Sequence, residues 1–201
     1  KDTYAGLLDY YLDTIRGYGI YGQYLDTSKC IRDLRVDLTY KDFTDLENYI
    51  QKIYPDSRRT DKMLESGFRY LTFYLPSFRI PKVYYLNMGL SQWPTFPVDD
   101  TTYCIGLDRC LGDDYPHYKD VGAQDYMAPH RRTTYLPVSF FSTVYQTMHP
   151  FNQTDKSLLD LMIQRGKEMY FLHKVLPYSP DSVLFGFSNV QLKWCSANEA
   201  L

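Results

Sequence analysis

The chain has 201 residues, of which 44% are hydrophobic and 23% are charged, and its formal charge at pH 7 is -2. This composition argues against disorder and predicts a single domain over residues 1–201 with its own core. The 22 basic residues are balanced by 24 acidic ones and form no long run. We therefore expect neither nucleic acid nor an anionic lipid surface as a partner.

Helical periodicity dominates the first part of the chain. Apolar residues recur at helical spacing over residues 2–15, 42–54 and 60–75, and Thr60 is a candidate N-cap of the third helix. Residues 17–22 read GYGIYG and match G-x-G-x-x-G. Because a helix and not a strand precedes them, this pattern favours a flexible turn over a dinucleotide site.

A small sheet and further helices are predicted next. Residues 80–87 and 100–105 are dense in β-branched and aromatic residues, which predicts two strands that pair as antiparallel neighbours. Four more helices are predicted: residues 137–148, a long helix from an N-cap at Thr154 or Asp155 to Leu176, a short one around 180–186, and one over 188–198. This order predicts a mostly helical α+β fold.

Tyrosine is the unusual residue of this sequence, with 21 of the 201 positions. Its side chain combines a large apolar ring with one polar hydroxyl. Such residues can replace leucine and phenylalanine in a core, or they can line a surface that binds a ligand or a partner. We favour the core interpretation and keep the binding surface as the alternative.

The four cysteines are Cys30, Cys104, Cys110 and Cys195, and none forms a C-x-x-C pair. A zinc knuckle or a thioredoxin-like redox site is therefore not indicated. An even count allows two disulfides, although a domain of this size does not need them. If the protein is exported, the expected pair is Cys104 with Cys110.

Common catalytic motifs are absent from the sequence, which contains no H-E-x-x-H, G-x-S-x-G or Walker A pattern. His173 falls on an apolar helical stripe, where a hydrogen-bonded core histidine is the favoured interpretation. His149 is expected at a helix C-terminus. Asp108, Asp113 and Asp114 are close in sequence, but turns are rich in aspartate, so a cation site is the weaker interpretation. We expect no cofactor.

Several segments in a fixed order resemble the GldB family of gliding-motility-associated lipoproteins. They are IGLDRCLG at 105–112, YPHY at 115–118, LLDLMIQRGKEMY at 158–170, Leu176-Pro177 with Asp181, and QLKWC at 191–195 followed by Asn198-Glu199. The resemblance runs from about residue 42 to the end. The family-motif positions are Gly106, Asp108, Gly112, Tyr115, Pro116, Gly166, Lys167, Gln191 and Trp194.

The resemblance implies a protein of the bacterial cell envelope, periplasmic or associated with the outer membrane. Its lipid would be attached upstream of Lys1, and the membrane would be contacted only through that anchor. It also implies a layout similar to zincin metallopeptidases, with residues 137–148 at the place of a degenerate metal-binding helix. We therefore expect a non-catalytic binding or scaffolding protein with a protein or glycan partner. The alternative is a zinc-dependent peptidase or hydrolase that uses His149, Glu168 or His173.

Physical roles can be assigned to some of the motif residues. Gly106 and Gly112 would allow a strand to turn sharply into a short helix, which Asp108 could cap. Trp194 is expected to be a core anchor, and Gln191 to satisfy a buried backbone group.

Overall fold

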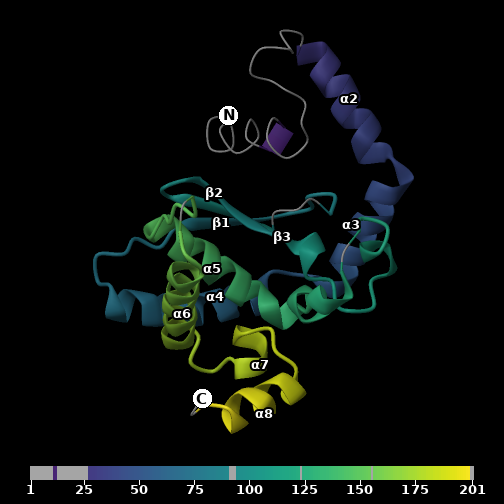
Figure 1. The fold of residues 1–201 in the computed structure, drawn as a ribbon. Coiled ribbons are helices and arrows are strands. Elements are labelled where there is room, and N and C mark those ends of the chain that lie inside the picture. Colours follow the sequence, from purple (N-terminus) through teal and green to yellow (C-terminus); the bar gives the residue numbers. More distant parts are fainter. Residues whose placement is uncertain (1–10, 13–26, 91–93, 123, 155, 200–201) are drawn as a thin grey trace. The chain divides into compact units, whose positions relative to one another are not determined.

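The computed structural model describes residues 11–12, 27–90, 94–122, 124–154 and 156–199 (Figure 1). The chain divides into two compact units: residues 1–55 with 81–109, and residues 56–80 with 110–201. The prediction of a single domain over residues 1–201 stays a prediction. The helix expected over 2–15, apart from residues 11 and 12, and the turn at 17–22 lie outside the described residues.

The first unit contains two helices and a small sheet. Helix α2 (Thr27–Thr39) was not predicted, whereas α3 (Lys41–Ile53) confirms the helix expected over 42–54. Leu46 and Ile50, one turn apart, are buried on the inner face of α3. The helix ends at Ile53 with Tyr54 as its C-cap, because Pro55 disfavours helical backbone at the residue before it.

The sheet has the strand order β1-β3-β2, with β1 (Lys82–Leu86), β2 (Thr95–Asp99) and β3 (Thr102–Gly106). The antiparallel pairing expected between the two predicted strands is wrong, because β1 and β3 run parallel. The antiparallel neighbour of β3 is β2, which the sequence did not reveal because Pro97 interrupts the strand pattern. Proline is tolerated in β2 because this strand lies at the edge of the sheet.

The second unit is built around α4 (Arg58–Tyr74), α5 (Leu136–Met148) and α6 (Leu158–Val175), followed by the short helices α7 (Asp181–Leu184) and α8 (Asn189–Ala197). In its core, the ring of Phe68 on α4 meets the rings of Phe140 and Phe141 on α5 edge to face, with centroids 5.6 and 5.3 Å away. Such pairs add to the hydrophobic stabilisation from burial.

Two helix starts differ from the predictions. Thr60 is not the N-cap of α4 but lies buried inside the helix, which begins after Ser57. The N-cap of helix α6 is Ser157, two or three residues beyond the expected N-cap at Asp155 or Thr154. The Ser157 hydroxyl accepts a hydrogen bond from the backbone N–H of Asp160, and the Asp160 carboxylate accepts one from the backbone N–H of Ser157. This reciprocal capping box satisfies two N–H groups that would otherwise lack partners.

The α+β prediction is confirmed, since the described chain is mostly helical with one small mixed sheet. The zincin-like layout stays a prediction. In the described ranges, no helix combines the length and the apolar character needed to cross a bilayer.

Candidate functional site

Helix α4 carries two separate stripes of side chains. One stripe is buried and forms part of the core of the second unit; it contains Thr60, Leu64, Gly67, Phe68 and Leu71. The other faces outward and contains Ser66, Arg69, Tyr70, Phe73 and Tyr74, again at spacings of three and four residues. The outward stripe is aromatic, whereas a solvated helix face is usually polar.

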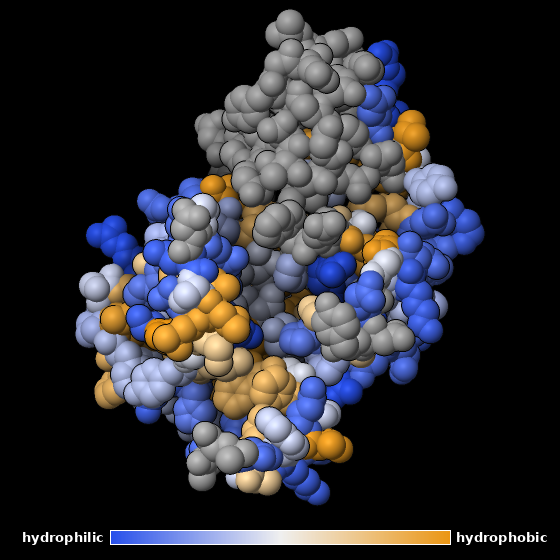
Figure 2. Space-filling model, in the orientation of Figure 1, coloured by the Kyte–Doolittle hydropathy of each residue, from blue (hydrophilic) through white to orange (hydrophobic). Residues whose placement is uncertain are grey.

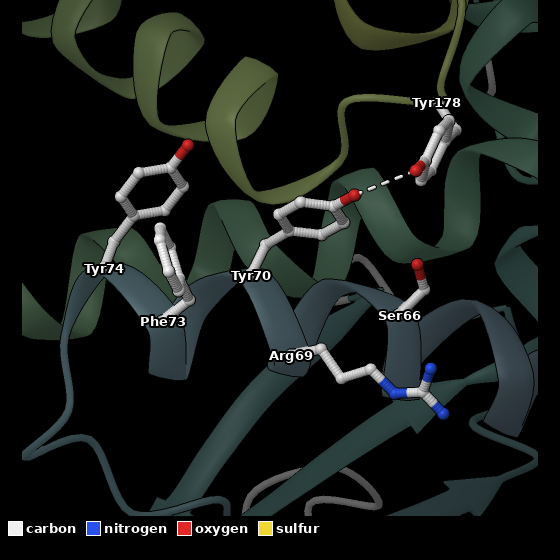
Figure 3. Close-up of a pocket in the computed structure, with 6 residues that line it drawn as sticks. All are labelled: Ser66, Arg69, Tyr70, Phe73, Tyr74 and Tyr178. Carbon is white, nitrogen blue, oxygen red and sulfur yellow. Dashed lines mark hydrogen bonds between the residues drawn. The ribbon is translucent and has the colours of Figure 1, made fainter.

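This outward stripe forms one side of a groove with a volume of about 440 Å³. Tyr178, from the segment between α6 and α7, lines the other side (Figure 3). The hydroxyl of Tyr70 donates a hydrogen bond of 3.0 Å to the hydroxyl of Tyr178, and the two rings meet edge to face with centroids 6.0 Å apart. This hydrogen bond ties together residues 108 positions apart in sequence.

The groove exposes aromatic surface to solvent. The exposed fractions are 76% for Phe73, 50% for Tyr74 and 81% for Tyr178. Figure 3 shows Tyr74, Phe73 and Tyr70 projecting from the same side of α4, while the side chain of Arg69 extends along the helix toward the Ser66 end. Within the described residues, Arg69 forms no ion pair.

The side chains that line the groove are suited to holding a ligand and not to catalysing a reaction. Its six lining residues offer aromatic rings, hydroxyls and one guanidinium, and they include no carboxylate, thiol or imidazole. The hydrogen bond to Tyr178 raises the pKa of Tyr70, so the Tyr70 hydroxyl stays neutral and keeps its proton at neutral pH. Such a site can hold a ligand by ring contacts, hydrogen bonds and one positive charge.

The three residues proposed for the alternative zinc site, His149, Glu168 and His173, do not form a metal site in the described structure. Glu168 is buried on α6, forms an ion pair of 2.8 Å with Arg165, and accepts hydrogen bonds from Ser142 and Gln146. His149 is exposed at the C-terminal end of α5. Across the described ranges, no three His, Cys, Asp or Glu side chains are placed to hold a metal ion. Asp113, considered above for a cation site, forms an ion pair with Arg132 instead.

His173 is exposed, so the prediction of a core histidine is wrong. The buried residues of α6 are Glu168, Leu172 and Val175, which lie on a different face from the predicted stripe. Apolar residues occur on more than one face of this helix. The outward ones near its start, Leu158, Leu159, Met162 and Ile163, are exposed, and Figure 2 shows apolar side chains gathered over α6.

Comparison with protein families gives one match, which covers residues 1–201 and is described as gliding motility protein GldB. The chain belongs to the GldB family. The family is one of gliding-motility lipoproteins, and membership suggests a location in the cell envelope. No curated protein and no solved structure matches the chain.

Two of the GldB-motif positions organise the end of the sheet in the first unit. Asp108 is fully buried and accepts hydrogen bonds from the backbone N–H groups of Met88 (3.0 Å) and Leu90 (2.8 Å). It therefore holds the segment after β1, and the prediction that it caps a short helix is wrong. Burial raises its pKa, against the opposing effect of these N–H groups. A Cβ on Gly106 would lie 2.9 Å from the Cγ of Met88, so any larger residue here would force the buried Met88 side chain to shift.

Three other motif positions shape a loop of the second unit. Gly112 has a φ of 106°, a conformation that favours glycine, and its N–H donates to the carbonyl of Arg131. Tyr115 is buried beside Tyr118, with ring centroids 5.2 Å apart, and Pro116 opens the short 3-10 turn that ends at Tyr118. These contacts give the motif a structural role in this loop.

The remaining motif positions lie on the surface. Gly166 and Lys167 are exposed on α6. Trp194 is 67% exposed on α8, so the prediction of a core anchor is wrong; this helix has no buried residue. Gln191 accepts from the backbone N–H of Ser188 at 2.8 Å, so it caps an exposed helix start and does not serve a buried group.

The expected pairing of Cys104 with Cys110 is also wrong, because both side chains are buried and no disulfide joins them. Burial raises the pKa of the Cys104 thiol to about 12, so this thiol is unreactive at neutral pH.

The groove residues were not singled out from the sequence. The available signal was the tyrosine content, for which a binding surface was the alternative interpretation. Both uses of tyrosine occur: Tyr103, Tyr115, Tyr118 and Tyr145 are buried, whereas Tyr40, Tyr74, Tyr170 and Tyr178 are exposed. A second signal was the spacing of aromatic residues in α4. Helical periodicity places them on a different face from the residues that fill the core, so they are not needed for packing.

Proposed function

We propose that this GldB-family chain is a non-catalytic component of the bacterial cell envelope that binds a partner through the aromatic groove of its second unit. The observation that carries the proposal is the outward stripe of α4 joined to Tyr178. In this proposal the chain is held at a membrane by a lipid attached upstream of Lys1, and the partner is a protein or a glycan of the envelope.

The composition of the groove supports binding. Tyrosine, phenylalanine and arginine are enriched in the centres of interfaces, and truncating them there typically costs more binding energy than truncating other residues. Leaving Phe73 and Tyr178 mostly in water forgoes the stabilisation that burial would provide, roughly 2 kcal/mol for a ring of this size. A partner that covers them recovers this free energy on binding.

Site-specific photo-crosslinking in cells tests the proposal. A photoreactive phenylalanine analogue is placed at Phe73 or Tyr178, and as a matched control at Tyr40, which is 61% exposed on the first unit. We expect discrete adducts from the two groove positions and none from the control. Digestion of the adducts with a protease or with a peptidoglycan hydrolase then separates a protein partner from a glycan.

A change within the groove should reduce the crosslinked adducts. Adding Arg69→Gln to the crosslinking chain is expected to weaken the adducts while leaving the thermal unfolding temperature unchanged, since Arg69 forms no ion pair in the described structure. Equal adducts from the groove and from Tyr40, or adducts from neither, would refute the proposal.

A further inference from the structure

We infer that the groove binds a peptide segment of a partner protein in which a carboxylate lies between apolar side chains. This inference rests on the proposed binding function and specifies the chemistry of the partner. It is built from the charge, the apolar surface and the length of the groove.

The charge of the groove selects an anion. Arg69 is the only charged residue among the six that line it, and no ion pair in the described structure neutralises its guanidinium. A guanidinium presents a planar fork of donors that matches the two oxygens of a carboxylate. An aspartate or glutamate side chain at the Ser66 end of the groove would meet this fork (Figure 3).

The apolar surface of the groove favours apolar side chains of a peptide. Phe73, which lies between Tyr70 and Tyr74 on the stripe, has a side chain that cannot form a hydrogen bond and is 76% exposed. Aliphatic or aromatic side chains of a peptide can bury this surface and gain the free energy of removing it from water.

The length of the groove fits a short extended segment. The stripe from Ser66 to Tyr74 covers nine residues of α4, and the eight steps between its ends correspond to about 12 Å along the helix axis. An extended peptide advances about 3.3 Å per residue, so about four residues would fill it. Because the Tyr178 hydroxyl accepts from Tyr70, its own proton remains available for a backbone carbonyl of that segment.

Selection of peptides tests this chemistry. Random peptides of about a dozen residues, displayed on phage, are selected on the purified chain, and the enriched sequences are synthesised with a fluorescent label. We expect them to share an aspartate or glutamate flanked by apolar residues. By fluorescence anisotropy, replacing that acid with its amide should weaken binding about tenfold, the loss typical of a charge-assisted pair.

Matched variants locate the binding site. Arg69→Gln and Phe73→Ala should each weaken binding about tenfold, whereas Arg59→Gln, on the same helix but outside the groove, should leave it unchanged. Each variant is checked by thermal unfolding. The chosen side chains are exposed, so all three variants should fold.

The alternative results overturn the inference. It is wrong if no peptide is enriched, if enriched peptides lack an acid, or if they bind Arg69→Gln as well as the parent chain. Soluble peptidoglycan fragments serve as the competing probe. Binding of these fragments without any peptide would overturn the peptide partner and leave the proposed binding function intact, and crosslinking at the groove tests that function separately.

Discussion

Replacing Gly67 with alanine would test how tightly the helical core of the second unit is packed. In the interior of an exposed helix, alanine is favoured over glycine by about 1 kcal/mol. Here a Cβ at position 67 would lie 2.2 Å from Cε2 and 2.4 Å from Cζ of Phe141. These distances are far below van der Waals contact, so either the ring or the helix must move.

Phe141 has little room to move. It is fully buried, and its ring contacts those of Phe68 and Phe140, with centroids 5.3 and 5.1 Å away. Overpacking a core costs roughly 1–3 kcal/mol, and this overlap places Gly67→Ala near the upper end. After the gain in helix propensity, we expect a net destabilisation of about 2 kcal/mol.

Gly166 provides the matched control. It also lies within a helix, α6, but apart from its chain neighbours and the nearby backbone of that helix no atom is within 4 Å of where its Cβ would be. Gly166→Ala should therefore stabilise the chain by up to about 1 kcal/mol. Urea unfolding followed by circular dichroism measures both variants, with a check that the transition is a single one.

A rescue experiment would confirm the cause. Adding Phe141→Leu to Gly67→Ala should cost less than the sum of the two single changes, because a smaller side chain at 141 relieves the overlap. The reasoning would be refuted if Gly67→Ala were neutral or stabilising, or if the two alanine variants shifted stability in the same direction.

Three further predictions concern local features. Since the folded pKa of Asp108 is raised, the contribution of this carboxyl to stability should be lost as pH rises above about 4. Urea unfolding as a function of pH should therefore show the parent chain losing stability relative to Asp108→Asn over this range, and parallel profiles would contradict the assignment. In thiol labelling of the native protein mapped by mass spectrometry, exposed Cys195 should react and buried Cys104 should not. Ser157→Ala should lower the stability of α6 by about 1 kcal/mol in thermal unfolding, whereas Thr154→Ala should have almost no effect.

Much of the secondary structure was predictable from the sequence because its causes are local. The spacing of apolar residues predicted α3, α4 and α5, and proline followed the ends of the first two and of α6. The start of α6 was misplaced because Thr154 and Ser157 are both capping residues, and only the reciprocal bonds between Ser157 and Asp160 distinguish them.

Burial was harder to predict than helix formation. Periodicity shows which residues of α6 share a face, but apolar residues lie on more than one of its faces. The face with Glu168 turned inward because α5 supplies Ser142 and Gln146 as hydrogen-bond partners for that carboxylate. His173 was consequently placed in a core that does not include it, and Trp194 was misplaced separately, because α8 has no buried residue.

The sequence by itself determined the helix-rich α+β class and the resemblance to the GldB family, since both follow from local patterns and ordered motifs. The tertiary structure alone decided that β1 and β3 run parallel, that Asp108 holds the segment after β1, and that Tyr178 meets Tyr70 across a groove. Each of these depends on contacts between residues far apart in the chain. Local propensity carries no information about such contacts, because the free energy that selects them arises only when the segments pack together.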